Sequence, residues 1–503
     1  MPTVNVNAFA TPKYTAREFH TTRAAAIQRI TQNTDKWTSF NLAELGMVLL
    51  DQNCFESDKL DFYLNRMCEE SYIGSAQHYR NVVRLLRLIH VFPDPTAAAE
   101  VPVTFTIDVA HSGFDIPAFT QVSDGSAKHV FYLTKKISVG SGETSASGVA
   151  RNARPVINYT VGVANGDQFF SIKIPLKKMT YGNTRVYGTY RDITTEWEVV
   201  DNFIGRDSDE RVVKLFHDSK GRGVLLFPDN VEGMIPEKGT VFSVNAWTGG
   251  GSDGNLVGTG KINRMLTLVS YVTGVTNTEE PSGGSDLPTK EKLKITGPAS
   301  IDTNYQPINE EKTRSILESY PGISDVRVVD FDSNVPARLK PTRFWEMWAY
   351  ISPDLGVYPN SIFLSKLKNY LYERKVVGKR ITVKAPIAYT FEHTFLVRLF
   401  ANSVDPSVAR QDIYDALDEY YQDLKQGVNV NLSDWIDLIE SVDGVDAVAL
   451  TDLTVTRSKG LSGETVVYRG SGFRWYKIYP GEKGYASSQY GNYVINFDTP
   501  TSR

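Results

Sequence analysis

The sequence predicts a multidomain α+β protein, and three patterns along its 503 residues lead to that prediction. A helical hydrophobic period ends near residue 92, short β-branched and aromatic runs follow, and helices alternate with strands from about residue 300. A chain of this length exceeds what one hydrophobic core supports. We therefore predict five parts: an N-terminal arm and helical bundle region (1–99), a β-rich domain (100–290), two α/β subdomains (291–388 and 389–455) and a C-terminal arm or small β appendage (456–503).

The helical region, about 15–92 after an extended arm, is best defined by its last helix, within SAQHYRNVVRLLRLIHVFP. Apolar side chains recur there at i, i+3, i+4 and i+7 and predict one buried face: Val82, Leu85, Leu86 and Ile89. Val83 and Leu88 add apolar surface outside this stripe. A helix this apolar around its circumference needs neighbours on more than one side. The predicted protein-interface residues are Val82, Arg84, Leu85 and Leu88.

The middle region has the composition of β-structure. VPVTFTIDVA, FFSIKIPL, TEWEVVDNF and GVLLFPD are short, rich in β-branched and aromatic residues, and separated by turn residues. The segment EEPSGGSDLPTK (279–290) is polar and contains Gly, Pro and Ser, so we expect a linker or loop.

Two similar phrases organise the C-terminal half: ESYPGISDVRVVDF from Glu318 and ESVDGVDAVALTDL from Glu440. Each predicts a helix end, a break at glycine and an alternating strand. Asn309 is the expected cap of the first helix and Ser433 of the second. The two phrases predict two related α/β subdomains, with an internal repeat as an open possibility. Residues 456–503 are rich in Gly and Tyr and show no helical period.

Composition argues against several classes of function. The net charge of −4 gives no electrostatic case for nucleic acid or an anionic membrane, and no apolar run approaches the ~18 residues of a membrane span. Cys54 and Cys68, on one helix, would lie ~21 Å apart and cannot bridge. With two cysteines and no basic-then-apolar start, the chain suits a reducing compartment and lacks the pattern of a signal peptide.

Motifs for catalysis or cofactor binding are weak. GGGSDG (249–254) fits dinucleotide and nucleophile motifs on paper, but no helix follows, so a glycine-rich turn is the better interpretation. His393 falls on an apolar strand face and is expected to be a core histidine. The acidic residues of 407–425 and the row Arg80, Arg84 and Arg87 favour solvated or interface faces over metal or phosphate sites. We predict no catalytic, cofactor-binding or metal-binding residue, and no enzymatic activity.

One long run resembles a known family. LAELGMVLLDQNCFESDKLDFYLNRMCEESYIGSAQHYRNVVRLLRLIHVFPDPTAAA is similar to the N-terminal region of baseplate J-like proteins, wedge subunits of contractile phage tails. Asp58, Tyr63, Arg66 and Glu70 match the family's D-x-x-x-x-Y-x-x-R-x-x-x-E-like element. FDIPAFTQV (114–122) and the glycine-rich stretch 223–255 resemble two further family turns, with Phe119 and the 227–230 turn departing from them.

The resemblance implies a structural protein of the virion tail baseplate, made in the host cytoplasm. Its N-terminal helices would bundle with a second copy and with a smaller wedge subunit, and its C-terminal domains would pair into a ring around the central hub. The implied partners are thus other copies, other wedge subunits, and hub and sheath-proximal proteins. The ring would help to trigger sheath contraction.

Three alternatives remain open. The β-rich middle and the aromatic tail also suit a receptor-binding or adhesin subunit. The same baseplate role exists in phage-derived contractile injection systems. A polysaccharide-degrading or lytic enzyme needs only two carboxylates, which leave no sequence signature.

Overall fold

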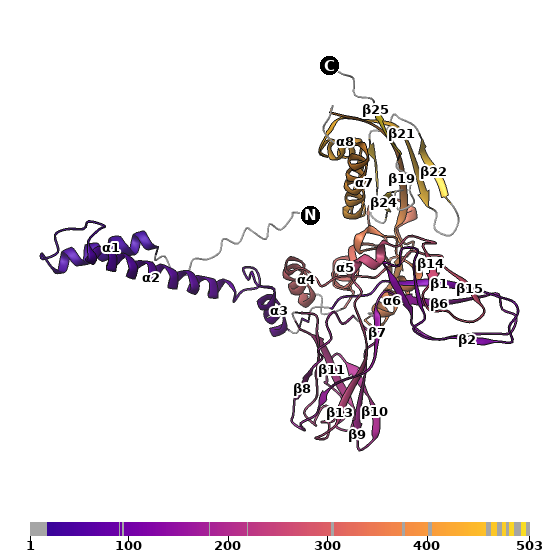
Figure 1. Cartoon of the computed structure of the whole chain (residues 1–503), viewed down its shortest axis with the longest axis horizontal. Helices are drawn as coiled ribbons and strands as arrows, with labels where there is room; N and C mark the ends of the chain where they lie inside the picture. The colour runs from indigo at the N-terminus through magenta and orange to yellow at the C-terminus, as the bar shows by residue number, and fades with distance from the viewer. Residues whose placement is uncertain are drawn as a thin grey trace. The chain divides into compact units, whose positions relative to one another are not determined.

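A computed structural model gives the fold of the chain (Figure 1). It describes residues 18–498 except for 90, 93–94, 181, 219, 303–305, 375–377, 401–404, 459–463, 470–474, 479–481 and 487–493. The predicted N-terminal arm lies outside the described residues. The chain divides into two compact units, one of residues 1–93 with 288–298 and the other of residues 94–287 with 299–503. The multidomain α+β prediction is confirmed, whereas the five predicted boundaries stay predictions.

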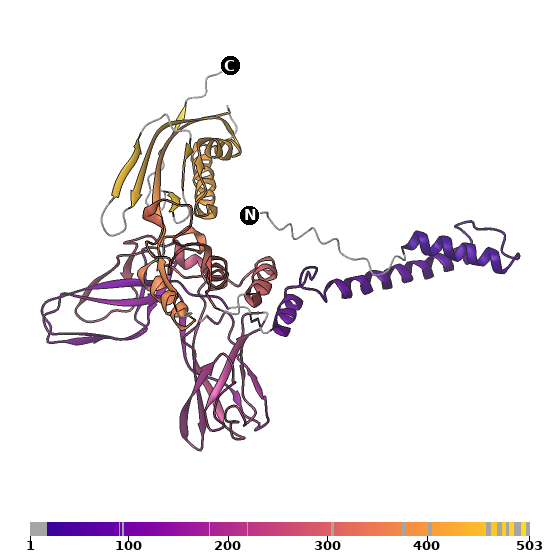
Figure 2. The ribbon, with the colours of Figure 1, turned by 180° about the vertical axis from the view of Figure 1, so that it is seen from behind.

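The first unit is helical. It contains α1 (Phe19–Asn33), α2 (Leu45–Glu69), α3 (Tyr79–Leu88) and most of α4 (Lys290–Asp302). Both views of the ribbon show α1 alongside α2 (Figures 1 and 2), and Arg23 and Asp51 join the two helices at 2.7 Å. The hydrophobic core of this unit lies between α3 and α4. It comprises Ala76, Val82, Val83, Leu86 and Leu293.

Helix α4 was not anticipated from the sequence. A Cβ atom on Gly297 would collide with Leu86, so glycine is needed where α4 meets α3. The helix therefore completes a core that lies about 200 residues upstream in the sequence.

The β-rich region of the second unit has two sheets, each with its own core. The six-stranded sheet has the order β14-β3-β4-β6-β1-β15 and the seven-stranded sheet has the order β7-β13-β9-β10-β11-β12-β8. Phe105 and Phe131 lie in the first core, and Trp197, Phe227 and Phe242 in the second. The strands are β1 (Glu100–Ile107), β3 (Gln121–Asp124), β4 (Val130–Leu133), β6 (Ser145–Arg151), β7 (Arg154–Val163), β8 (Ser171–Lys173), β9 (Arg185–Tyr190), β10 (Ile193–Val200), β11 (Val212–His217), β12 (Gly223–Leu226), β13 (Val241–Thr248), β14 (Ile262–Met265) and β15 (Val272–Asn277), with β2 (Phe114–Ile116) and β5 (Ile137–Val139) as a separate pair.

The GGGSDG segment is the predicted turn. Gly249, Gly250 and Gly251 all have positive φ angles, from 72° to 123°, and only a short 3-10 helix (Ser252–Leu256) follows them. Residues with a Cβ atom rarely adopt positive φ angles, which explains the three consecutive glycines.

The first α/β subdomain is a three-stranded sheet, β16 (Ile323–Val329), β17 (Glu346–Pro353) and β18 (Arg380–Lys384), covered by α5 (Glu310–Glu318) and α6 (Ser361–Glu373). Asn309 caps α5 as predicted, because its side chain accepts a hydrogen bond of 2.8 Å from the Lys312 amide.

The second subdomain packs α7 (Pro406–Asp423) and α8 (Leu432–Glu440) on one side of a sheet built on β19 (Ile387–Leu399) and β21 (Val445–Ser458) (Figure 1). The described tail strands β22 (Glu464–Arg469), β24 (Glu482–Ala486) and β25 (Val494–Asp498) join this sheet, which confirms the predicted β-like tail. β20 (Val430–Asn431) and β23 (Trp475–Tyr476) form a small pair. Ser433 does not cap α8: the N-cap is Asn431, and Ser433 lies inside the helix.

His393 is a core histidine, as predicted. It is buried, its Nε2 atom lies 2.9 Å from the Tyr421 hydroxyl, and burial lowers its pKa to about 3. The repeated phrases also share local geometry: Gly322 and Gly444, with φ angles of 86° and 89°, each follow a helix and precede a strand. A common origin of the two subdomains stays a hypothesis.

The segment 279–290, predicted as a linker or loop, is a loop up to the start of α4, and half of it is interior. Residues 280–285 form a loop that is buried throughout. Asn360, at the start of α6, donates hydrogen bonds from Nδ2 to the Glu100 carbonyl (2.6 Å) and the Glu280 carbonyl (2.9 Å). Beside this loop, the buried Glu100 carboxylate pairs with Arg151 and Lys366 at 2.5 and 2.6 Å. The loop thus holds the six-stranded sheet to the first α/β subdomain.

Candidate assembly surface

Helix α2 exposes an unusual amount of apolar surface. Leu60, Tyr63, Leu64 and Met67 recur at i, i+3, i+4 and i+7, the spacing of a buried face, yet they are 67%, 54%, 47% and 70% exposed. Within α2 only Met47 and Cys54 are buried, and α1 buries no residue. Exposed apolar surface of this extent is typical of an interaction site. The assembly surface is defined here as the exposed apolar residues of α2: Leu45, Val48, Leu49, Phe55, Leu60, Phe62, Tyr63, Leu64 and Met67.

The four interface residues predicted on α3 fall into two groups. Val82 is fully buried in the core of its own unit, and Leu85 is half-buried against that core. Arg84 is exposed and Leu88 is 78% exposed. The α3 prediction therefore remains a prediction at Arg84 and Leu88, whereas the Val82 side chain is committed to the chain's own packing.

Sequence analysis missed the larger surface on α2. The signal was present, because Leu60, Tyr63, Leu64 and Met67 already show helical spacing in the sequence. What the spacing alone does not tell is whether a stripe packs inside the chain or against another chain.

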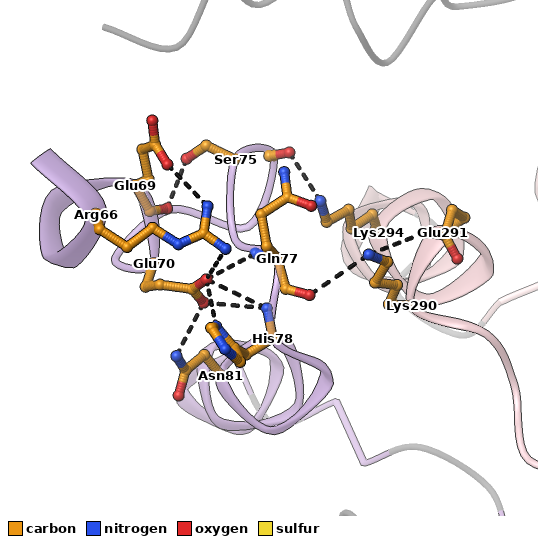
Figure 3. A network of polar contacts seen from close by, with 11 residues as sticks. Arg66, Glu69, Glu70, Ser75, Gln77, His78, Asn81, Lys290, Glu291 and Lys294 are labelled. Carbon is orange, nitrogen blue, oxygen red and sulfur yellow. Dashed lines mark hydrogen bonds and ion pairs between the residues drawn. The ribbon is translucent and has the colours of Figure 1, made fainter. Parts of the chain in front are cut away.

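A polar junction fixes the end of this helix (Figure 3). Glu70 directly follows α2, and its carboxylate accepts hydrogen bonds from the Gln77 amide (3.0 Å), the His78 amide (3.3 Å) and Asn81 Nδ2 (2.9 Å). His78 is the N-cap residue of α3, but its side chain accepts no capping hydrogen bond from the helix. Glu70, at the end of α2, therefore bonds the amide of the N-cap residue of α3 and the Asn81 side chain in the first turn of that helix.

Electrostatics favour the ionised form of Glu70. Partial burial raises its pKa, but the hydrogen bonds from Asn81, His78 and Gln77 outweigh burial and hold the pKa at about 2. His78 Nδ1 lies 2.7 Å from the carboxylate and Arg66 lies 3.5 Å away. The junction is thus built around a carboxylate that stays charged near neutral pH.

Helix α4 holds the turn between α2 and α3 from the other side (Figure 3). Lys294 Nζ donates to the Gly74 carbonyl at 3.0 Å and Lys290 Nζ to the Gln77 carbonyl at 3.5 Å, while Leu293 packs into the α3 core. Glu70 and the two lysines of α4 therefore bond two amides and two carbonyls of the turn. This arrangement supports a fixed direction of α2 relative to α3.

The residues that carry the family resemblance take part in these features. Tyr63 belongs to the assembly surface and Arg66 and Glu70 belong to the junction, while Asp58 lies half-buried on α2 ahead of all three. In the described part of the chain, no three His, Cys, Asp or Glu side chains gather as a metal site would require. No described helix has the length and apolar character of a membrane span.

Comparison with known proteins gives one match that bears on this surface. Residues 18–88 match the family model of the bacteriophage baseplate protein, N-terminal domain. The matched segment contains α1, α2 and α3. It is therefore similar to a baseplate domain, although the match does not single out the baseplate J-like family.

The other comparisons add little. No curated protein matches the chain. Among solved structures, a chain of the "Cryo-EM structure of the anti-feeding prophage (AFP) baseplate, 6-fold symmetrised" aligns with 92% of this chain and 89% of its own length, at 15% identity and a TM-score of 0.33. At that TM-score the likeness carries no argument.

Proposed function

We propose that this chain is a structural wedge subunit of the baseplate of a contractile phage tail or a phage-derived contractile machine. The observation that carries the proposal is the assembly surface on α2, which lies inside the segment that matches a baseplate N-terminal domain. A helix with a stripe of exposed apolar residues on one face is incomplete without a partner.

The proposed partners of this surface are the same helices of a second copy, together with a smaller wedge subunit. Leu60, Leu64 and Met67 would interdigitate with equivalent side chains, and burial contributes roughly 25 cal/mol per Å² of apolar area. The resemblance to baseplate J-like proteins supports this choice. The junction at Glu70 would transmit the direction of the paired helices to α3.

The proposed role is mechanical and not enzymatic. Copies joined through these helices would also pair through their α/β subdomains, forming a ring around the hub in the virion tail. A change in the geometry of the ring would then release the sheath. Such switching needs interfaces with two packings of similar free energy, and no catalytic group.

A co-purification experiment on the full chain tests the proposal. The double variant Leu60→Glu, Leu64→Glu would be expressed together with the other wedge subunits of its own machine. We expect it to lose self-association and to leave the wedge complex, because each substitution puts a charge into the proposed contact. Leu268→Glu is the matched control, since Leu268 is 92% exposed and lies outside the helical unit.

Normal co-purification of the double variant would overturn the proposal. Binding of the purified wild-type chain to host cells, without self-association, would instead support a receptor-binding subunit.

A further inference from the structure

The two α/β subdomains keep separate hydrophobic cores. Ile316, Val326, Phe363 and Leu367 belong to the first core. The second core comprises a different set, which includes Phe391, Phe395, Leu417, Trp435 and Ile439. The chain crosses from β18 to β19 through only two residues, 385 and 386. Each subdomain can therefore remain packed while its position relative to the other changes.

The contact between these subdomains combines a small apolar cluster, in which Ile387 of β19 packs against Val329, Leu339 and Tyr350, with several polar side chains. The amide of Gln426, which follows α7, donates to Asp325 Oδ2 on β16 at 3.0 Å. Its Nε2 atom donates to the Tyr350 carbonyl on β17 at 3.2 Å. Asp325 and Gln426 are both buried. A loop of the second subdomain is thus hydrogen-bonded to two strands of the first.

An ion pair with one buried partner lies in the same contact. Arg338, in the short 3-10 helix Ala337–Leu339 of the first subdomain, donates from Nη2 to Glu482 Oε1 on β24 at 2.7 Å. The Tyr389 hydroxyl donates to the same oxygen at 3.2 Å. Glu482 is fully buried, whereas the Arg338 side chain is 44% exposed. The arginine can thus return to water, and the carboxylate it leaves keeps a hydrogen bond from its own subdomain.

We propose that these contacts form a separable polar joint: the Arg338–Glu482 ion pair holds the two α/β subdomains together, and when the pair opens, each subdomain moves as a rigid body with its core intact. The joint is defined by Asp325, Arg338, Gln426 and Glu482. Opening an apolar contact exposes hydrophobic area, but opening a polar joint exchanges protein hydrogen bonds for hydrogen bonds to water. Contacts between domains that move are of this polar kind.

Hydrogen exchange of the full chain, followed by mass spectrometry, tests the joint. The reporter is the segment 424–430, because it contains the Gln426 amide that is bonded to Asp325. Helices α6 and α8 report on the two cores. The test variants are Glu482→Gln, which keeps the shape of the side chain, and Arg338→Met. The matched control is Arg398→Met, which removes the exposed ion pair of Arg398 with Asp446 in the same sheet.

In both test variants we expect exchange of 424–430 to rise about tenfold, as the loss of one charge-assisted hydrogen bond implies. Exchange of α6 and α8 should stay at the wild-type level, and Arg338→Lys should restore part of the protection. Equal loss of protection in α6, α8 and 424–430 would overturn the proposal, because the joint would then be part of one cooperative core. Exchange of 424–430 no faster than in the Arg398→Met control would overturn it as well.

Discussion

Helix α2 and the loop 280–285 place their side chains in opposite environments. The helix has a regular apolar stripe, and that stripe faces outward. The loop consists of Glu, Pro, Ser and Gly, and it is buried throughout. Hydrophobic character alone would have assigned the two segments the other way round.

Burial follows the available partners as much as it follows polarity. The loop can be buried because its polar groups are satisfied: Asn255 exchanges hydrogen bonds of 2.8 and 2.9 Å with the backbone of Gly284, and the Asn360 amide donates to the Ser282 hydroxyl at 3.1 Å. The helix remains apolar outside because, in our proposal, its partner is another chain. Five substitutions test this contrast.

The largest effect is expected at the buried ion pair beside the loop. Burial raises the pKa of Glu100, but Arg151 and Lys366 hold it below its usual value, so the carboxylate is charged. Glu100→Gln would leave the buried Arg151 without its counter-charge and should cost about 3–5 kcal/mol of folding free energy, measured by urea denaturation. Asp115→Asn, which affects an exposed pair with Lys136, is the control and should leave the curve unchanged. Equal denaturation curves for the two variants would mean that the buried Glu100 ion pair contributes little to folding stability.

The next largest effect on stability is expected when a buried leucine is truncated, in contrast to an exposed one. Leu86→Ala removes a fully buried side chain between α3 and α4 and should destabilise the helical unit by about 2–4 kcal/mol.

Leu64→Ala, on the assembly surface of α2, should leave the stability of the unassociated chain within about 0.5 kcal/mol of wild type. Thermal denaturation at low protein concentration compares the two variants. A large loss for Leu64→Ala would show that α2 is held within its own chain after all.

A smaller, pH-dependent effect is expected at Glu70. Its folded pKa of about 2 lies below the ordinary 4.5, so the folded state binds fewer protons there than the unfolded state. The resulting stabilisation is present above pH 4.5 and is lost as the pH falls toward 2.

Glu70→Gln should therefore cost about 1–2 kcal/mol at pH 7, the size of a helix cap, and should cost less at pH 3. Denaturation at the two pH values measures the difference, with Glu69→Gln as the control that leaves the Gln77 and His78 amides bonded to Glu70. A pH-independent cost would indicate a packing role for Glu70 and not a charge-dependent one.

The smallest effect is expected on α3. Leu88→Ala alters a side chain that is 78% exposed, so the folding free energy of the isolated chain should change by less than about 0.5 kcal/mol. Wedge assembly should weaken if the predicted α3 contact exists, which co-purification would reveal. Unchanged assembly would restrict the proposed contact to α2.

Much of the fold could be predicted because its signals are local. The cap at Asn309, the positive-φ Gly322 and Gly444, and the alternation of Phe391, His393 and Phe395 depend on nearest neighbours along the chain. Fold class and many of the helices and strands follow from such patterns. The site was predicted only in part, since α3 was chosen and the broader stripe on α2 was overlooked.

The sequence by itself determined the periodicity of each element, its caps and its turns, because these arise from backbone sterics and short-range hydrogen bonds. The tertiary structure alone decided where each face points. It placed α4 against α3, buried Val83 while leaving Leu88 outside, enclosed the loop 280–285, and brought Glu70 to the start of the next helix. These outcomes depend on contacts between residues far apart in the chain, and no local pattern specifies which partner a surface will meet.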